Sequence, residues 1–390
     1  MSETVTTPAG RLTLSTPDAL LASIPHLIGF PPTESVVIVG IAAERPNGPS
    51  TVRLTQRVDR PPADSTLDDV RDMAREVAAP MLRSGSTEVI ITVFADQTPG
   101  TDGILPETAL VDELVTAFDE LGVRIRDTLF TDGTSRWSYG CTDPACCPPS
   151  GRVIPQELRT LVAAEFTGAG SAIVPSRKAL VAEVAPADPD ALADVSQHVA
   201  IAEAAREQAI GDRPPTRGRS SNTNALETWR EETLATIAAV TSREPATPSS
   251  LAGAALGLGD VRVRDTVLWD LMRPGVDTDA AIAGLTAVVR HAPAGHVAPA
   301  ATVLAVCHWT SGDGARANAA LERAVEDDPA YSLSVLVGAS LRAGLPPQSW
   351  REAMAGLTRD TCRHGDTPPR PRPAAAPRAR RSVTSPGLAL

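Results

Sequence analysis

The sequence predicts an α/β sandwich on a mostly parallel sheet, followed by an all-α helical region. From residue 16 to about residue 185, short β-branched runs alternate with helical periodicity, which is typical of βαβ units. From residue 223 onward every periodic segment is helical. Residues 211–222, rich in Pro, Gly, Ser and Arg, stand between the two patterns and indicate a linker.

These observations divide the chain into four parts. We expect an α/β domain over residues 1–210, a linker over 211–222, an all-α domain over 223–362 and a disordered tail over 363–390. The tail holds six Arg, six Pro and one Asp, and so carries a net charge of +5. Because the whole chain carries −11, the first 362 residues carry −16.

Capping residues and apolar stripes predict the helices of the first domain. Thr16, Pro17 and Asp18 form an N-cap, a proline at the first helical position and an acidic first turn. Apolar residues at three- and four-residue steps predict the later helices. These cover residues 67–81, 106–121, 158–166, 175–180 and 188–210.

Apolar, β-branched runs predict the strands. A continuous run over 36–41 is typical of a strand buried on both faces, whereas 52–58 alternates with polar residues and lies nearer an edge. Further strands are predicted over 88–95, 123–131 and 134–139. Asp132-Gly133 between the last two indicates a tight hairpin, so the final strand should run antiparallel to its neighbour.

The second domain contains one segment with repeat-like spacing. Small and apolar residues over 304–329 stand at the offsets of a tetratricopeptide-type (TPR-like) unit, while the flanking segments match poorly. Helices are predicted over 226–240, 250–258, 260–272, 277–291, 297–310, 313–326 and 331–342. Such units need about three stacked copies for stability, so a helical bundle containing one TPR-like hairpin is preferred over a full array.

Composition narrows the compartment and the partners. The N-terminus lacks an apolar core of signal-peptide length, and no apolar stretch is long enough for a membrane helix, so we expect a cytoplasmic protein without membrane insertion. Five cysteines, three of them clustered, do not form a secreted disulfide pattern and should be reduced. The net charge argues against nucleic acid as a partner, except weakly through the Arg-rich tail.

Three segments carry a family resemblance. LSTPDALLASIPHLIGFPPTESVVIVG at 14–40, WSYGCTDPACCPPSG at 137–151 and PSRKAL at 175–180 are similar to the DUF4192 family of actinobacterial proteins. The resemblance covers nearly the whole chain and implies an actinobacterial source, in agreement with 35 Arg against a single Lys. It implies no activity, cofactor or site residue.

Cys141, Cys146 and Cys147 form the first candidate site. Three thiolates and one further ligand, such as His26, would complete a tetrahedral zinc site. A redox or nucleophilic role, with Cys147 as a catalytic candidate, is a second interpretation. The third is simple packing of small thiols beneath the sheet edge, which is favoured because C-x4-C-C spacing is unusual for zinc.

Carboxylates at predicted strand ends form the second candidate. Asp59, Asp96 and Asp132 each follow a predicted strand, and ligands of parallel sheets bind at that edge. Together they would offer the oxygen ligands that Mg²⁺ prefers. Each also has a structural interpretation as a turn residue.

Two further groups are weaker candidates. Ser176, Arg177 and Lys178 begin a predicted helix, where N–H groups and cations would favour an anionic cofactor, although an exposed, solvated helix start is the favoured interpretation. Among the histidines and cysteines of the helical half, only Cys362-x-His364 has metal-ligand spacing, and His308 is expected to pack in the core or line a groove. The full set is His291, His296, Cys307, His308, Cys362 and His364.

Phosphate-loop, dinucleotide-binding, zinc-protease and nucleophile-elbow motifs are absent from the sequence. We therefore expect a binding or interaction module, with a protein partner held by the helical domain. The alternative is an enzyme of unknown class, metal- or thiol-dependent, with its site at the strand ends. A third hypothesis is a nucleic-acid or acidic-surface binder acting through the tail.

Overall fold

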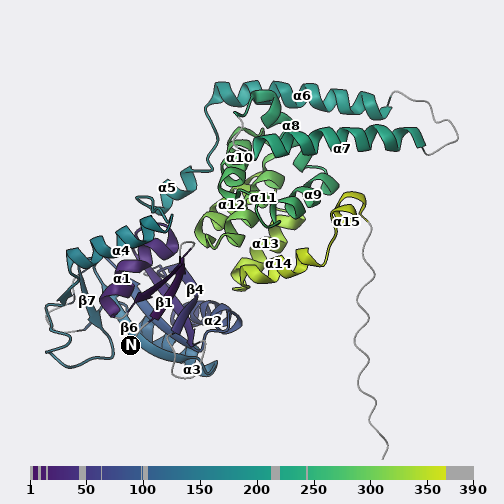
Figure 1. Ribbon diagram of the computed structural model, residues 1–390. Helices are drawn as coiled ribbons and strands as arrows, with labels where there is room; N and C mark the ends of the chain where they lie inside the picture. The colour runs from purple at the N-terminus through teal and green to yellow at the C-terminus, as the bar shows by residue number, and fades with distance from the viewer. Residues whose placement is uncertain are drawn as a thin grey trace, which may run out of the picture.

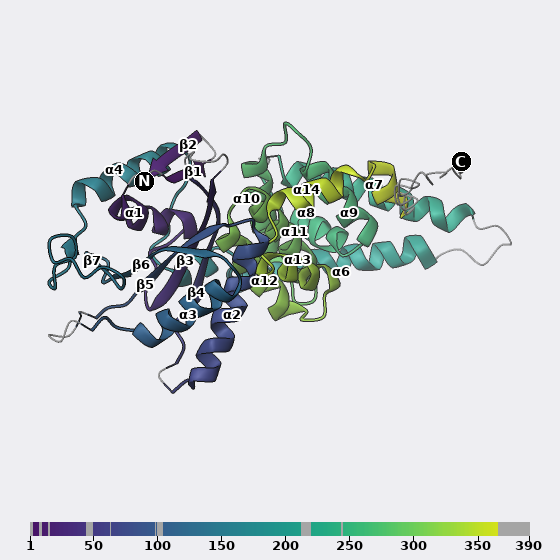
Figure 2. The ribbon, with the colours of Figure 1, turned by 90° about the horizontal axis from the view of Figure 1, so that it is seen from below.

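The computed structural model describes residues 3–7, 10–14, 16–43, 50–62, 64–97, 99, 104–211, 220–242 and 245–365. The chain forms a sheet covered by helices, and a helical region lies beside it (Figure 1). Figure 2 shows the two halves side by side. Most of the predicted linker, residues 212–219, and residues 366–390 of the predicted tail lie outside the described residues.

The sheet has eight strands in the order β2-β1-β4-β3-β5-β6-β7-β8. Only the β1/β4 and β5/β6 pairs are parallel, and the other five pairs are antiparallel. The strands are β1 (Glu3–Thr7), β2 (Gly10–Leu14), β3 (Ser35–Ala43), β4 (Ser50–Asp59), β5 (Glu88–Phe94), β6 (Arg124–Thr131), β7 (Ser135–Ser138) and β8 (Arg152–Val153).

The prediction of a mostly parallel sheet is therefore wrong. Parallel neighbours need a crossover of a dozen or more residues, but only residues 44–49 separate β3 from β4, so these strands pair as a hairpin. β4, β5 and β6 do run in the same direction, yet β3 lies between β4 and β5 and is antiparallel to both. The predicted antiparallel strand after Asp132-Gly133 is confirmed as β7.

Helices cover both faces of the sheet. α1 (Pro17–Ile28) and α4 (Gln156–Gly168) lie on one face, where Val37 and Val39 of β3 point. α2 (Leu67–Arg83) and α3 (Thr108–Glu120) lie on the other, where Val36 and Ile38 point. Successive side chains of β3 point to opposite faces of the sheet and enter the two hydrophobic cores in turn. This explains why the apolar run of β3 is continuous.

Local capping chemistry sets the helix starts. The Thr16 hydroxyl accepts the Ala19 N–H, and Pro17 occupies the first helical position as predicted. Thr66 and Asp69 form a reciprocal capping box at the start of α2. The short helix α5 (Arg177–Ala182), capped by Ser176, leads from the sheet half to the helical region.

The helical region follows α5. It comprises α6 (Pro189–Gly211), α7 (Ser220–Val240), α8 (Pro248–Leu258), α9 (Val261–Leu271), α10 (Thr278–His291), α11 (Val297–Thr310), α12 (Gly314–Asp327), α13 (Ser332–Arg342), α14 (Pro347–Ala355) and α15 (Arg359–His364). α6 packs against α8 of this region, and the domain limits drawn from the sequence stay a prediction.

α11 is the central helix of this region. All its side chains are buried, and it contacts α8, α9, α10, α12, α13 and α14. α11 and α12 form the predicted hairpin, but neighbours enclose α11 on all sides, whereas the helices of a solenoid repeat contact only the next repeat. The region is thus a bundle around one helix. No described helix is both long and apolar enough to cross a membrane.

Candidate functional site

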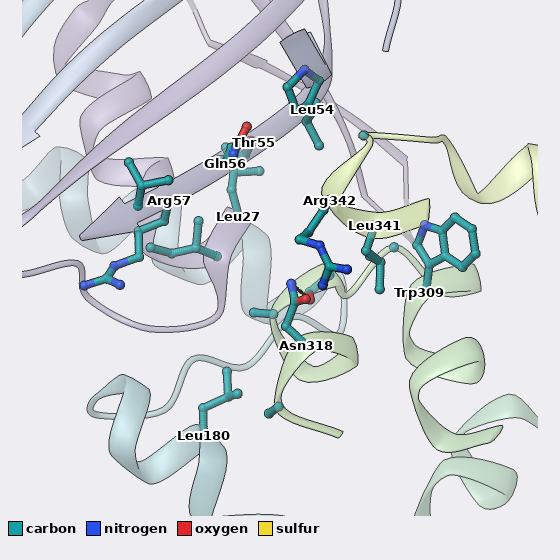
Figure 3. Close-up of a pocket in the computed structure, with 18 of the residues that line it drawn as sticks. Leu27, Leu54, Thr55, Gln56, Arg57, Leu180, Trp309, Asn318, Leu341 and Arg342 are labelled. Carbon is teal, nitrogen blue, oxygen red and sulfur yellow. Dashed lines mark hydrogen bonds between the residues drawn. The ribbon is translucent and has the colours of Figure 1, made fainter. Parts of the chain in front are cut away.

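A cavity of about 700 Å³ lies between β4 and the helical region. Figure 3 shows β4 on one side, with α11, α12 and the end of α13 opposite, and α1 and α5 completing the wall. Cavities of this size hold drug-sized ligands or short peptide segments. The cavity is therefore the first place to look for a ligand site.

Two seams join the halves at the margins of the cavity. At one, the Arg83 guanidinium donates to the Ala343 carbonyl (2.7 Å), and Gly344 lies so close to Pro80 that a Cβ there would stand 2.7 Å from its carbonyl oxygen. At the other, Arg316 binds Glu183 (2.7 and 3.0 Å), and Arg177 pairs with Glu322.

β4 presents its edge, rather than one face, to the cavity. All eight residues from 52 to 59 line it, and successive residues of a strand point to opposite faces, so the cavity must follow the strand's margin. In the described chain β1 pairs with β4 only at Ser50 and Thr51. The rest of this edge is open, in agreement with the predicted edge position.

The ladder register shows which backbone groups point into the cavity. Bonded pairs alternate in an antiparallel ladder, and the Arg60 N–H donates to the Glu34 carbonyl (3.4 Å). Residues 34 and 60 continue the register of the β3/β4 ladder, so every second pair from them is also hydrogen-bonded. One of these pairs is Ile38 with Gln56, so the backbone groups of Gln56 point toward β3. The N–H and C=O groups of Thr55 and Arg57 then point away from β3, toward the cavity. They are the unpaired groups that an added strand would need.

Side chains of β4 add unpaired polar atoms to the same wall. Gln56 Oε1 and Arg57 Nε are buried and have no hydrogen-bond partner among the described residues. Buried polar atoms are usually satisfied, so both atoms are available to bond with a molecule that enters the cavity. Both side chains come from the stretch of β4 that lines the cavity in Figure 3.

The cavity has a cationic bias. Four arginines and two carboxylates line it, in a chain of net charge −11. The Arg57–Asp59 and Arg177–Glu322 pairs neutralise two of the arginines. Arg53 and Arg342 are exposed and form no ion pair within the described chain. The remaining lining is largely apolar and includes Leu27, Leu54, Leu180, Trp309 and Leu341.

The structure places the three predicted aspartates at the same end of the sheet but does not bring them together as a metal group. Asp59 pairs with Arg57 (2.7 Å) at the rim of the cavity. The Asp96 N–H donates to Glu34, and Asp132 accepts the N–H groups of its own turn. The only described group with metal-ligand spacing is the cysteine cluster.

An arginine clamp lies at this end of the sheet. Arg60 binds Glu34 and Glu107, the latter at 2.7 Å. Glu34 and Glu107 are the only described non-glycine residues with positive φ, at 45° and 59°. Such backbone strain persists only where the surroundings impose it, and the clamp supplies that restraint. These residues could not be predicted from the sequence because long-range ion pairs leave no local pattern.

The predicted anion site at the start of α5 is occupied by protein contacts. The Ser176 hydroxyl caps Ala179 N–H at 3.2 Å, and Arg177 pairs with Glu322 across the cavity. Lys178 is exposed and does not line the cavity. An anionic cofactor here stays a prediction.

The three clustered cysteines do meet in space. Their sulfur atoms all lie within 4.8 Å of one another, and the thiols are free. His26 does not join them: it stacks on Phe166 (4.8 Å between ring centroids), and burial lowers its pKa. The proximity of the three thiols was predicted from the sequence, whereas His26 as a fourth ligand is not supported by the fold.

Hydrogen bonds and burial act differently on the three thiols. The Asp143 N–H bonds to Cys141 and lowers the pKa of that thiol, with a further contribution from Cys147. Partial burial, together with the neighbouring thiols, raises the pKa of Cys147 to about 11. Cys141 is therefore the first of the two to ionise.

The histidines and cysteines of the helical half differ in burial: His291 and His296 are half-buried and His364 is exposed, whereas Cys307, His308 and Cys362 are buried. Cys307 and His308 are buried within α11, where burial lowers the pKa of His308. Cys362 is buried in α15, and His364 lies on the same helix. No described pair of these residues belongs to a metal-ligating group.

The cavity itself was missed because its walls are far apart in sequence. Residues 52–59 face residues 309–347, and the TPR-like spacing of the second segment says nothing about β4. The one available signal was the polar alternation of β4, which indicated an edge strand. What covers that edge depends on how the two halves pack.

Comparison with known families matches residues 17–348, across both the sheet and the helical region, to a family described as domain of unknown function (DUF4192). No curated protein matches the chain. The solved structures likewise contain no match. Because the matched residues make up most of the chain, the protein belongs to the DUF4192 family.

Proposed function

We propose that this protein is a binding module that takes up an extended segment of a partner protein as an added strand on β4. The observation that carries this proposal is the outward edge of Thr55 and Arg57, which faces a cavity of about 700 Å³. In strand addition, main-chain hydrogen bonds supply affinity and pockets for alternate side chains supply specificity.

The cavity walls define the chemistry of the segment. Arg53 and Arg342 offer unpaired cations, while Leu180 and Trp309 belong to the apolar part of the wall. Side chains of an added strand alternate between two directions. A segment that alternates acidic and apolar residues would match both kinds of surface. The helical region supplies the wall opposite β4, so it takes part in holding the partner.

An enzyme at the strand ends has less support. The Asp59 carboxylate is held in an ion pair with Arg57, and Asp96 is fixed only through its backbone N–H, which donates to Glu34. The third hypothesis, binding through the tail, concerns residues mostly outside the described chain. It predicts that deleting residues 363–390 abolishes nucleic-acid binding, whereas peptide uptake at β4 should survive this deletion.

Peptide binding to the full chain tests the proposal directly. A fluorescent peptide alternating valine and glutamate should bind saturably, as measured by anisotropy, and a matched valine–lysine peptide should not. An N-methylated version of the acidic peptide should compete with it only weakly. Its blocked backbone amides cannot donate the hydrogen bonds that complete the ladder. Equal binding of both charge types, or none of either, would contradict the proposal.

Charge reversal separates the cavity from the rest of the surface. Arg53→Glu and Arg342→Glu should each weaken binding of the acidic peptide by about tenfold, or ~1.4 kcal/mol. Lys178→Glu is the matched control, because this exposed cation lies beside the cavity without lining it. A loss of binding in the control equal to that in the two arginine variants would show nonspecific attraction.

A further inference from the structure

The cysteine loop, residues 140–151, is far more ordered than an exposed turn requires. Asp143 organises it: its carbonyl accepts the N–H groups of Cys146 (3.1 Å) and Cys147 (2.7 Å), and its carboxylate accepts that of Ala145 (2.9 Å). These bonds return the chain to Cys141. Three sulfurs thus converge although four residues separate the first cysteine from the second.

The loop is also anchored to the sheet. The Trp137 indole N–H donates to the Pro149 carbonyl (3.0 Å), and Trp137 packs against Phe130 with ring centroids 5.4 Å apart. Gly151 has φ 78°, and a Cβ there would lie 2.4 Å from the Trp137 ring, so only glycine allows this approach. The positions of the three thiols are therefore fixed before any ligand arrives.

We infer that Cys141, Cys146 and Cys147 form a three-thiolate site for a thiophilic divalent ion, Zn²⁺, with the fourth position open to water. Tetrahedral zinc with bonds of about 2.3 Å places its sulfur ligands about 3.8 Å apart. The sulfurs already lie within 4.8 Å of one another, so closing onto the ion requires shifts of about 1 Å or less.

Charge and exposure fit this site. Zn²⁺ and three thiolates sum to −1, and the positive charge of Arg136 on the neighbouring strand, which pairs first with Asp18, also acts on Cys146 and Cys147. Cys146 is exposed, which gives an ion access and leaves room for a water ligand. Soft sulfur ligands select zinc over Mg²⁺ or Ca²⁺. A disulfide would use only two of the three converging thiols.

Metal titration of the reduced full chain tests this inference. With Co²⁺ as the probe, we expect one ion per chain, a sulfur-to-cobalt charge-transfer band and the strong visible absorption of a tetrahedral centre, all displaced by Zn²⁺. Cys146→Ser, at the exposed position, should lower Zn²⁺ affinity by more than about 100-fold, and Asp143→Ala by about tenfold. Cys362→Ser, a cysteine outside the cluster, should leave the titration unchanged.

Several outcomes would overturn the inference. One is reduced, folded protein that takes up neither ion. Another is uptake that persists when all three cysteines are replaced by serine, which would place the metal elsewhere. A third is recovery of the chain with a disulfide between two of the three thiols and no uptake of Zn²⁺ after reduction. Circular dichroism of each variant confirms that the fold is retained.

Discussion

The two edges of the sheet are handled in opposite ways. At one edge β8 has only two residues, both exposed, and the cysteine loop precedes it. At the other edge β2 and β1 are the outer strands, but β1 pairs with only the first two of the ten residues of β4. The short edge offers almost nothing for pairing, whereas the long edge is left open along the cavity.

This difference determines where another strand could pair with the sheet. Exposed edge strands invite aggregation, and proteins commonly shorten, charge or cover them. β8 is shortened. β4 is instead screened by the helical region, which stands across a cavity from it without filling the space. A long edge reachable only through a cavity can accept a selected segment and exclude unselected strands.

The largest expected effect distinguishes the inward and outward residues of β4. Gln56→Pro removes an N–H that bonds to β3 and should lower the free energy of unfolding by about 3 kcal/mol or more. Thr55→Pro removes only an outward N–H and should cost about 1 kcal/mol, because edge positions tolerate proline. Urea denaturation measures both changes.

The same two variants also test whether the outward side of β4 binds the peptide. Thr55→Pro should abolish peptide uptake while the protein stays folded. Equal destabilisation by the two prolines would mean that the assigned parity of the ladder is wrong, and with it the open edge.

The next effect concerns the seam that positions the helical wall. Gly344→Ala places a methyl group 2.7 Å from the Pro80 carbonyl oxygen at a φ of 68°, and should cost about 2 to 4 kcal/mol. Gly295→Ala is the matched control, with φ 85° and no atom within 4 Å, and should cost about 1 kcal/mol. Thermal or urea unfolding that shows equal costs would argue against tight packing at this seam.

Much of the sheet half could be predicted from the sequence because its signals are local. Thr16 and Pro17 start α1 as predicted, and the Asp132-Gly133 hairpin pairs β6 with β7. Which strands lie next to each other in the sheet depends on contacts between residues far apart in the sequence. The alternation of strands and helices predicted a mostly parallel sheet, and it could not show that β3 lies antiparallel between β4 and β5.

A smaller effect is the pH dependence of stability that comes from His308, near the Arg316–Glu183 ion pair. His308 is buried near Asp313, Arg316 and Glu183, and burial lowers its pKa below the ordinary 6.5. The unfolded chain therefore takes up a proton before the folded one as pH falls. This contribution to stability is present above about pH 6.5 and is lost below it.

His308→Gln tests this dependence. Between pH 7 and pH 5 the wild-type free energy of unfolding should fall by about 1 kcal/mol more than that of the variant. Burial lowers the pKa of His26 in the same direction, so His26→Gln serves as a second arm of the experiment. Parallel pH profiles for the wild type and His308→Gln would contradict the buried, neutral state of this imidazole.

The smallest effect is expected for the strand-end carboxylates. Asp59 pairs with Arg57, but its side chain is 80% exposed, so Asp59→Asn should change the free energy of unfolding by less than about 0.5 kcal/mol. Urea denaturation at low and high salt provides the measurement. A loss of several kcal/mol would give this aspartate a structural role that its exposure does not suggest.

The candidate sites show the same limit of sequence reasoning. The three cysteines were recognised because they lie within seven residues, and the fold brings their sulfurs together. The cavity was not recognised because Thr55 and Trp309 are separated by the whole middle of the chain. A cluster of reactive residues that are close in sequence can be recognised from the sequence. A cavity between two halves of the chain can be recognised only when their relative positions are known.

Amide hydrogen exchange at β4 tests the central claim most directly. In the free protein the outward N–H groups of Thr55 and Arg57 should exchange faster than the inward N–H of Gln56. Addition of the acidic alternating peptide should slow exchange at Thr55 and Arg57 and leave Gln56 nearly unchanged. Peptide binding without added protection at these two amides would contradict strand addition at the β4 edge.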